Sequence, residues 1–427
     1  MWKRILSNDF NKNVITLLSG TTIAQAIPLI ISPILTRIYS PEDFGVYALF
    51  VSIITIFGSI ANAKYELAIV LPAEDEDAIN IASLSLIIAA LFSFSLLLIV
   101  LFLHDYLVYI LGNEQISTWL YVAPGVVLLV GLFNMLNYLN TRFKNYKDIS
   151  RANIYKSVVT GVVQLSIGFL KPGELGLILG QILSNITGNT RLLKNILRKN
   201  NILKVVNIKE MKRLAKEYKE YPTFTMWGGL SNTLSQNITS IFISSLYSLT
   251  ILGYFSLIQR ILGTPIRLVG SSIGQVYFQK AAEEKRKTGN AKLTFNSTLK
   301  KLLIISLPSF TFLFFFIDDI VTLIFGTEWA KAGNYAQLLM PLFFLRFVVT
   351  PLSITNPLFK KNKFGLLWQV GLLALTLVIF GLAKYFRLEP EVLFLTYSIV
   401  LSFYYIYFFY KIKKHSYGKD LEGEING

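Results

Sequence analysis

The stretch that decides the fold is Ile79–Leu103, INIASLSLIIAALFSFSLLLIVLFL. It contains no charged side chain, and it is longer than the roughly 20 apolar residues that an α-helix needs to cross a bilayer. Its apolar residues also lack the strict alternation of a membrane β-strand, so the stretch predicts a transmembrane helix. Composition agrees, because 53% of the 427 residues are hydrophobic, more than is usual in a soluble domain.

Similar apolar blocks lie on both sides of this stretch. Together they predict an all-α polytopic membrane protein with about twelve transmembrane helices. A count of eleven or thirteen stays open, since one block could be re-entrant. The expected spans are residues 14–38, 44–70, 79–103, 119–140, 152–170, 175–193, 223–247, 251–278, 302–325, 332–358, 364–383 and 391–410.

The positive charges are distributed unevenly between the two sides of the membrane. Of the 41 Lys and Arg residues, 31 fall in connections on one side and five in connections on the other. Lys and Arg are retained on the cytoplasmic side, so this distribution predicts a bacterial inner-membrane protein with both termini cytoplasmic. No basic nucleic-acid-reading module is present, and we expect no nucleic-acid partner.

The longest connection divides the chain into two sets of six spans. We expect an N-terminal lobe at 1–198, a cytoplasmic amphipathic linker at 199–221, a C-terminal lobe at 222–411 and a basic cytoplasmic tail at 412–427. Apolar residues in the linker recur at helical spacing, which is typical of a helix lying on the anionic inner leaflet; a solvated charged linker is the alternative.

Weak internal similarity relates the two lobes. Gly20 and Gly45 recur as Gly228 and Gly253 at a common offset of 208 residues. Six-span repeats begin and end on the same side, so they predict a pseudo-two-fold axis along the membrane normal. Transporters built in this way hold their substrate between the halves and work by alternating access.

Five cations lie inside the expected spans: Lys64, Lys156, Arg260, Arg267 and Arg346. A charge near the bilayer centre costs roughly 2.5–3.5 kcal/mol on insertion scales, so it usually faces a partner or a watery cavity. Lys64 and Lys156 lie near cytoplasmic span ends, where snorkelling is the simpler interpretation. Arg260 and Arg267 are seven residues apart, which predicts a ladder of positive charge on one helix face.

Polar side chains inside the spans extend this hypothesis. The candidates for the lining of a hydrophilic cavity are Gln25, Gln164, Asn232, Gln236 and Gln259. Hydrogen bonding between helices, without contact to a substrate, is the alternative for each of them.

The charge balance inside the spans favours an anionic cargo. Of the 25 acids, Asp318, Asp319 and Glu391 fall toward the ends of expected spans, and Glu66 could form an ion pair with Lys64 or couple transport to an ion. Carriers of cations usually need buried carboxylates. Guanidinium groups instead bind phosphate and carboxylate through paired hydrogen bonds, so the cavity cations favour a phosphate or an acidic sugar.

Signals of chemistry are few. Cysteine is absent, and the two histidines, His104 and His415, lack the spacing of metal ligands. We therefore expect no catalytic residue, no metal and no cofactor, and we do not expect an enzyme.

Four stretches resemble a known family: ILTRIYSPEDFGVY at 34–47, KYELAIVLP at 64–72, LGYFSLIQRILGTP at 252–265 and GSSIGQVYF at 270–278. They are similar to the bacterial polysaccharide-biosynthesis flippases, the Wzx-like O-antigen and capsule oligosaccharide translocases of the multidrug/oligosaccharidyl-lipid/polysaccharide exporter superfamily. The resemblance implies a two-lobed, V-shaped transporter of twelve spans. It also implies that cavity cations, here Arg260, Arg267, Arg346 and Lys64, attract the anionic part of the substrate.

The implied substrate is an undecaprenyl-pyrophosphate-linked oligosaccharide, with membrane lipids around it and a polysaccharide polymerase and a chain-length regulator as further partners. Three alternatives remain: a small-molecule or multidrug antiporter of the same superfamily, a membrane polymerase or ligase, and a scaffold for polysaccharide assembly.

Overall fold

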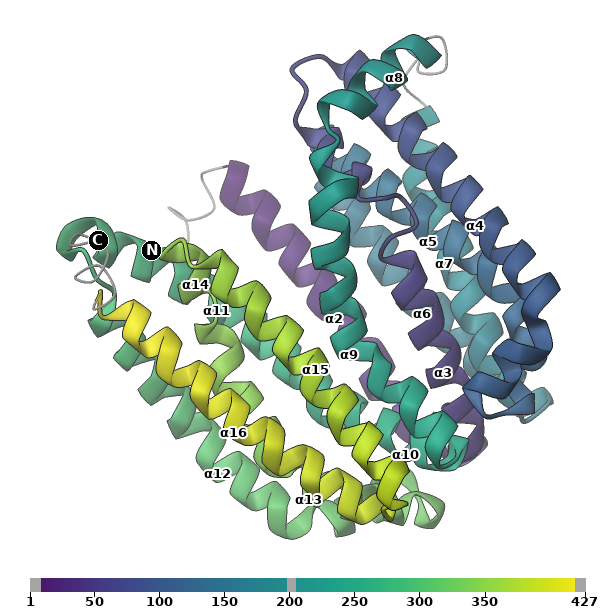
Figure 1. Cartoon of the computed structure of the whole chain (residues 1–427), viewed down its shortest axis with the longest axis vertical. Coiled ribbons are helices and arrows are strands. Elements are labelled where there is room, and N and C mark those ends of the chain that lie inside the picture. Colours follow the sequence, from purple (N-terminus) through teal and green to yellow (C-terminus); the bar gives the residue numbers. More distant parts are fainter. Residues whose placement is uncertain (1–8, 198–204, 419–427) are drawn as a thin grey trace. The chain divides into compact units, whose positions relative to one another are not determined.

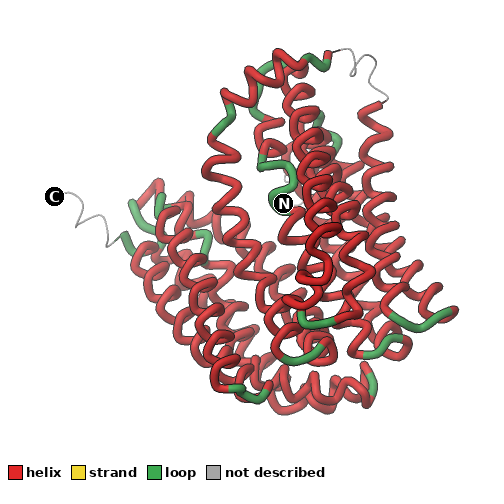
Figure 2. Tube along the Cα trace, turned by 45° about the vertical axis from the view of Figure 1, so that its right-hand side comes forward, coloured by secondary structure: helices red, strands yellow, loops and turns green. Residues whose placement is uncertain are grey.

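The chain is helical in all the parts that the structure describes. The computed structural model describes residues 9–197 and 205–418, and no strand occurs among them (Figure 2). The expected cytoplasmic end at 1–8, the start of the linker at 199–204 and the end of the tail at 419–427 lie outside the described residues. The longer helices are α2 (Asp9–Ile38), α3 (Pro41–Gly58), α4 (Asp75–Leu111), α5 (Ser117–Arg142), α6 (Tyr146–Leu170), α7 (Glu174–Leu197), α8 (Ile208–Glu217), α9 (Met226–Leu246), α10 (Leu249–Ile258), α11 (Thr264–Thr288), α12 (Lys292–Phe325), α13 (Ala330–Leu352), α15 (Asn362–Phe386) and α16 (Pro390–Ser416). Shorter turns of helix are η1 (Tyr65–Val70), η2 (Glu114–Ile116), η4 (Tyr221–Thr225), η5 (Gln259–Gly263), η6 (Thr327–Trp329) and α14 (Thr355–Leu358).

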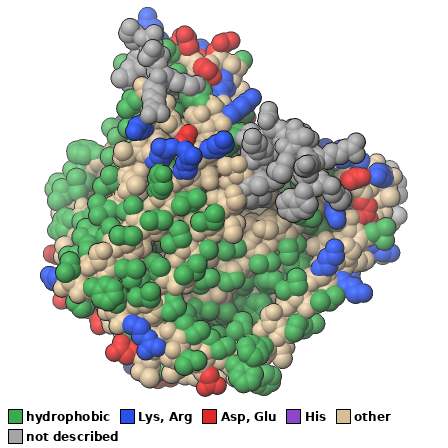
Figure 3. All heavy atoms as spheres, turned by 180° about the vertical axis from the view of Figure 1, so that it is seen from behind, with side chains coloured by type: hydrophobic (Ala, Val, Ile, Leu, Met, Phe, Trp, Pro, Cys, Tyr) green, Lys and Arg blue, Asp and Glu red, His purple; other side chains and the backbone are tan. Residues whose placement is uncertain are grey.

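Membrane-spanning helices dominate the fold. Within the described ranges, nine helical segments are long and apolar enough to cross a membrane. The other three expected spans, α6, α7 and α9, are also helical but are more polar, because they carry the stripes of Asn, Gln, Ser and Thr noted in the sequence. Hydrophobic side chains cover much of the face in Figure 3, and most charged side chains lie toward its margins. The protein is thus an all-α multi-pass membrane protein.

The expected span at 44–70 is wrong in its second half. The helix α3 ends at Gly58, and the backbone then turns, with positive φ at Ala63 (48°) and Lys64 (63°). The side chain of Asn62 holds this turn, because it donates to the Ser85 hydroxyl at 2.9 Å and is buried. Only the short 3₁₀ helix η1 follows.

The expected span at 251–278 is also not one regular helix. Between α10 and α11 the π-turn η5 intervenes, and the Thr264 amide donates to the Gln259 carbonyl five residues earlier. Pro265 has no amide hydrogen to offer the carbonyl four residues before it, which disrupts the regular α-helical ladder at this point. A single π-turn inside an α-helix is frequent at functional sites.

Two compact units make up the chain, Met1–Gly253 and Tyr254–Gly427. The division falls after α9, whereas the sequence places a lobe boundary at residue 222. The helix α9 belongs to the first unit because it packs on α3. In the second unit, α12 packs on α13, α13 on α16, and α15 runs beside α16 (Figure 1).

The equivalent glycines of the two repeats make reciprocal contacts. A Cβ atom on Gly45 would overlap the backbone of Leu249, and a Cβ atom on Gly253 would overlap the backbone of Pro41. Leu249 and Gly253 follow Pro41 and Gly45 by the same offset of 208 residues. All four residues lie within the compact unit Met1–Gly253, so these close approaches are part of its own packing.

The linker helix α8 packs on the first unit. Its apolar side chains Met211 and Leu214 are buried, 6% and 1% exposed, and α8 packs on α4. The amide of Asn207, which precedes α8, donates to the Asn80 side chain at 2.8 Å. The structure has a helix at the expected linker, and on its apolar face Met211 and Leu214 are covered by the protein, whereas Ile208 is 69% exposed.

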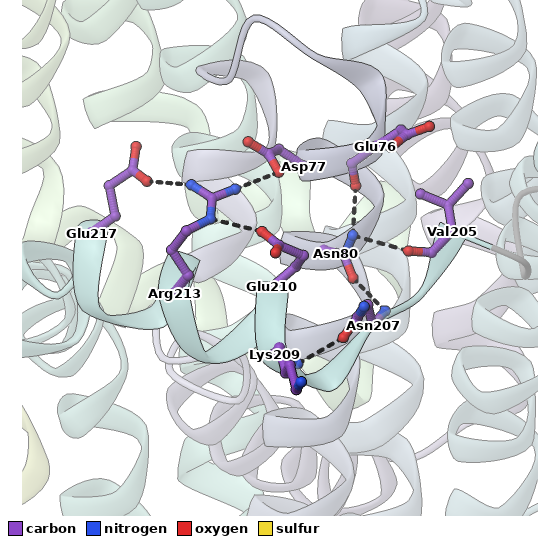
Figure 4. Close-up of polar contacts among 9 residues, drawn as sticks. All are labelled: Glu76, Asp77, Asn80, Val205, Asn207, Lys209, Glu210, Arg213 and Glu217. Atoms are coloured by element: carbon purple, nitrogen blue, oxygen red, sulfur yellow. Dashed lines mark hydrogen bonds and ion pairs between the residues drawn. The ribbon is translucent and has the colours of Figure 1, made fainter.

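Charged groups hold α8 in this position (Figure 4). Arg213 donates to Asp77 of α4 at 2.6 Å, and to Glu210 and Glu217 of its own helix at 2.7 and 3.0 Å. Hydrogen bonds to Glu210 and Asp77 raise the pKa of Arg213 above its usual value, so the arginine stays charged. This contact gives a structural role to Asp77, one of the three acids in the first turn of α4.

Candidate functional site

Two arginines of the second unit form the most unusual charge arrangement in the membrane part. Arg267 lies on α11 and Arg346 on α13, two helices that pack together, and the charge of Arg346 acts directly on Arg267. Close packing is possible because Gly274 of α11 leaves room for Ile354, which follows α13. Like charges repel, and no ion pair joins either arginine to an acid in the part of the chain that the structure describes.

Neutral groups hold these two guanidinium groups. Arg267 is exposed, and its Nη2 donates to the Thr264 hydroxyl at 3.1 Å. Arg346 is half-buried, its Cζ lies 5.7 Å from the centre of the Phe343 ring, and it shares a hydrogen bond with Tyr405 of α16. Hydroxyl and ring partners fix the positions of the cations without neutralising them. The pair thus keeps its capacity to bind an anion.

Gln259 and Arg260 both belong to the π-turn η5 and are half-buried. The side-chain oxygen of Gln259 lies over Gly263, so the glutamine folds back along its own helix. Because a π-turn holds more residues than an α-turn, the common face expected for Arg260 and Arg267 no longer follows from their spacing. Arg346, on the neighbouring helix α13, is a further cation whose charge acts on Arg267.

Lys64 and Glu66 form an ion pair in the first unit. The distance from Lys64 Nζ to Glu66 Oε1 is 3.7 Å, and their side chains are 19% and 4% exposed. Lys64 also lies against Gly229 of α9. The second carboxylate oxygen, Glu66 Oε2, is buried and accepts no hydrogen bond from the described residues. The Tyr65 hydroxyl donates to the Ala215 carbonyl of α8 at 2.9 Å, which ties this segment to the linker helix.

Lys156 and Gln164 of α6 are enclosed by neighbouring helices. Lys156 Nζ donates to Asn185 of α7 at 2.8 Å and lies 3.9 Å from the centre of the Phe133 ring. Gln164 is 2% exposed; its side-chain amide donates to the Leu177 carbonyl at 3.1 Å, and its backbone carbonyl accepts from the Tyr39 hydroxyl at 2.6 Å. These contacts favour helix packing over cavity lining for the polar stripe of α6.

The remaining polar candidates lie on α2 and α9. Gln25 is half-buried. On α9 the exposed Gln236 donates to the side chain of the half-buried Asn232 at 3.1 Å. Polar side chains on the surface of a membrane helix are unfavourable against lipid, which favours a watery environment along this face of α9.

Sequence reasoning missed the juxtaposition of Arg267 and Arg346, because these residues lie on different spans and no local pattern relates them. It also missed the break after Gly58. For the π-turn next to Arg260 the sequence did offer a signal, which is Pro265. No group of three or more His, Cys, Asp or Glu residues that could hold a metal ion occurs in residues 9–197 and 205–418.

Comparison with known proteins identifies the family. The model of the family described as polysaccharide biosynthesis protein matches residues 34–334, a range that holds Lys64, Lys156, Arg260 and Arg267 and ends before Arg346. This chain belongs to that family. The teichuronic acid biosynthesis protein TuaB of Bacillus subtilis (strain 168) is 20% identical over 264 residues, which are 62% of this chain and 54% of TuaB. The chain thus matches about half the length of that relative.

Solved structures agree on the fold. The lipid II flippase MurJ in an inward closed conformation is 15% identical and superimposes with a TM-score of 0.71 over 93% of this chain and 90% of MurJ. An inward-facing multidrug resistance MATE family transporter of the MOP superfamily is 16% identical, with a TM-score of 0.64 over 93% and 96% of the two chains. The family member described here therefore has the two-lobed fold of MOP-superfamily transporters.

Proposed function

We propose that this chain is a flippase for an undecaprenyl-pyrophosphate-linked oligosaccharide, the repeat unit of a surface polysaccharide such as an O-antigen or a capsule. It moves this substrate across the cytoplasmic membrane by alternating access. The polysaccharide biosynthesis family and the MOP-superfamily fold both support a transporter of lipid-linked sugars. A transporter needs no catalytic residue, so the proposal does not include an enzyme activity.

The observation that carries the proposal is the arginine pair of α11 and α13. Two neighbouring cations in membrane helices, with no acid between them, are unfavourable unless an anion is present for part of the cycle. A pyrophosphate carries at least two negative charges and several acceptor oxygens, and arginine binds such groups through paired hydrogen bonds. Arg267 and Arg346 are thus the proposed head-group ligands, and the nearby Arg260, with the half-buried Gln259 beside it, is proposed to assist.

The experiment measures surface polysaccharide and the lipid-linked intermediate of the inner leaflet in strains that carry Arg267→Ala or Arg260→Ala. We expect surface polysaccharide to fall and the intermediate to accumulate, because the head group loses a ligand. Replacement by Lys should restore export in part, since the charge persists but the forked geometry is lost.

A matched control is Lys300→Ala, which removes one exposed positive charge from α12. It should leave both readouts unchanged at equal protein level. If the arginine variants export as well as the control while the protein is present in normal amounts, the proposal is wrong.

An antiporter of cationic drugs is the rival within the same fold. Such a carrier is expected to use a buried carboxylate, and the candidate in the described residues is Glu66, which is already paired with Lys64. Efflux assays with cationic dyes separate the two functions. We expect cells with the unchanged protein to export no more dye than cells with the Arg267→Ala variant.

The remaining features of the proposal follow from the sequence. The charge distribution supports an inner-membrane location with cytoplasmic termini. A polymerase and a chain-length regulator that receive the translocated repeat unit are the proposed protein partners. Cross-linking in the intact membrane tests both points.

A further inference from the structure

A basic pocket lies at the end of α11, in the second unit and away from the arginine pair. It has a volume of about 550 Å³ and is lined by Phe278, Gln279, Ala282, Lys285, Arg286 and Leu358. Five of these residues lie on α11 at helical spacing, and Leu358 of α14 faces them. The volume falls in the range of small-molecule sites.

The acids near this pocket are engaged elsewhere. Glu283 forms an ion pair with Lys287 at 2.8 Å. Glu284 accepts hydrogen bonds from the amides of Leu293 and Thr294 at 2.9 and 2.7 Å, and so caps the first turn of α12. The charge of Glu283 also acts on Arg286, but neither carboxylate forms an ion pair with Lys285 or Arg286 among the described residues.

Two cations are available to a ligand. Lys285 Nζ donates to the Leu358 carbonyl at 2.8 Å and lies 4.5 Å from the centre of the Phe359 ring, so the lysine is fixed in place. Arg286 is exposed, and no ion pair of Lys285 or Arg286 with an acid occurs within the described part of the chain. A fixed ammonium beside an exposed guanidinium suits a phosphate group.

The pocket is amphipathic along the helix. Phe278, which is 43% exposed, lies seven residues before Lys285, a rise of about 10 Å along an α-helix. The apolar end is thus nearer the middle of the chain's membrane helix, and the charged end is nearer the basic connection that follows α11. A glycerophospholipid has the same order, with acyl chains toward the bilayer centre and a phosphate at its surface.

We propose that this pocket binds the head group of an anionic membrane phospholipid, with the phosphate on Lys285 and Arg286 and the first acyl carbons on Phe278 and Leu358. Basic pockets between transmembrane helices on the cytoplasmic side bind anionic head groups by the same physics. The bound lipid is a ligand of the protein surface and not the transported substrate, so the proposal stands apart from the flippase function.

The experiment titrates the purified full chain in detergent with short-chain phosphatidylglycerol and counts bound lipids by native mass spectrometry. Phosphatidylcholine is the neutral comparison lipid. A lysine or arginine near an anionic head group contributes about a fivefold gain in affinity. We therefore expect Arg286→Gln to weaken phosphatidylglycerol binding about fivefold, and the double variant Lys285→Gln, Arg286→Gln about 25-fold.

Lys280→Gln is the matched control, because it removes one exposed positive charge from α11 at a position that does not line the pocket. It should leave phosphatidylglycerol binding unchanged. The double variant could disturb the fold, because Lys285 donates to the Leu358 carbonyl. The single variant Arg286→Gln avoids this problem, since Arg286 makes no ion pair with an acid in the described residues.

Two further measurements distinguish a phospholipid head group from free inorganic phosphate as the ligand. Phe278→Ser should weaken phosphatidylglycerol binding, and millimolar inorganic phosphate should not displace the lipid, because the acyl contact is part of the site. If phosphate displaces the lipid and Phe278→Ser has no effect, the pocket is a site for a free anion and the lipid assignment is overturned. Equal losses in Lys280→Gln and Arg286→Gln would reduce the effect to general surface charge and would also overturn it.

Discussion

The two units treat a positive charge in the membrane in opposite ways. In the first unit Lys64 is paired with Glu66, and Lys156 is enclosed by Asn185 and an aromatic ring. In the second unit Arg267 and Arg346 lie on two helices that pack together, and they are held by hydroxyl groups and a ring without an ion pair to an acid among the described residues. A compensated cation serves the fold, whereas an uncompensated pair is suited to an external anion. This difference is the reason why we propose the ligand role for the second unit.

The strongest test of this comparison exchanges one cation of each unit for a neutral side chain of similar length. Arg346→Met should lower transport of a lipid-linked oligosaccharide into proteoliposomes about 10- to 100-fold, because a charge-assisted hydrogen bond contributes roughly 1.5–3 kcal/mol. Lys156→Met should change transport by less than about threefold, since methionine can fill the site against Phe133. Equal losses of transport in both variants would contradict the proposed difference between the two units.

Glu66→Gln leaves Lys64 without its acidic partner, so that the first unit, like the second, contains a cation without an ion pair. We expect the free energy of unfolding to fall by about 1–3 kcal/mol, the usual result of leaving a buried polar group without its partner. Thermal unfolding in detergent measures it. The double variant Lys64→Met, Glu66→Gln should recover most of the loss, and if it does not, the pair is not what compensates Lys64.

The same variant tests ion coupling, since Glu66 Oε2 is buried without a hydrogen bond from the described residues. If Glu66 takes up a proton during transport, Glu66→Gln should remove the stimulation of transport by an imposed proton gradient. Transport measured with and without the gradient decides this. A variant that responds to the gradient like the unchanged protein would leave Glu66 with the structural role alone.

Arg346→Lys sharpens the comparison further, because it keeps the charge and removes the planar fork. We expect transport to fall about three- to tenfold, less than in Arg346→Met, since one ammonium replaces paired guanidinium hydrogen bonds. The matched change Arg267→Lys should give a similar loss. Full activity in both variants would mean that charge alone, without forked geometry, holds the substrate.

The smallest effect is expected at Arg213, where the first unit compensates a cation outside the membrane. Arg213→Ala should speed hydrogen exchange of the α8 amides about two- to fivefold, with a larger effect at low salt. Because the pKa of Arg213 is raised, its contribution is fully present below the ordinary arginine pKa and should stay constant from pH 6 to 9. A change of α8 protection within that pH range would contradict the assignment.

The sequence predicted the helices well, because long apolar runs leave few other structures in a membrane. It failed where the backbone depends on distant contacts. Ala63 and Lys64 give no local turn signal, and the break after Gly58 is held by a bond from Asn62 to Ser85. A polar residue in a span does not tell what it faces: for Gln164 the sequence left cavity lining and hydrogen bonding between helices open, and its burial and its bond to Leu177 favour the second.

The candidate site was predicted in its residue types but not in its arrangement. Arg260, Arg267 and Arg346 stand out in the sequence because charges are rare in apolar spans. Their pairing depends on the packing of α11 on α13 and on the π-turn beside Arg260, and neither follows from spacing on a single helix. The role of these residues as head-group ligands stays a prediction until the variants are measured.

The reciprocal crossing at Gly45 and Gly253 limits how this chain can diverge. A side chain at either position would meet backbone atoms, which cannot move aside by changing a rotamer. A change at Gly45 therefore requires an adjustment around Leu249, and a change at Gly253 requires one around Pro41. At this crossing the two repeats must evolve together, although their lipid-facing surfaces are free to drift apart.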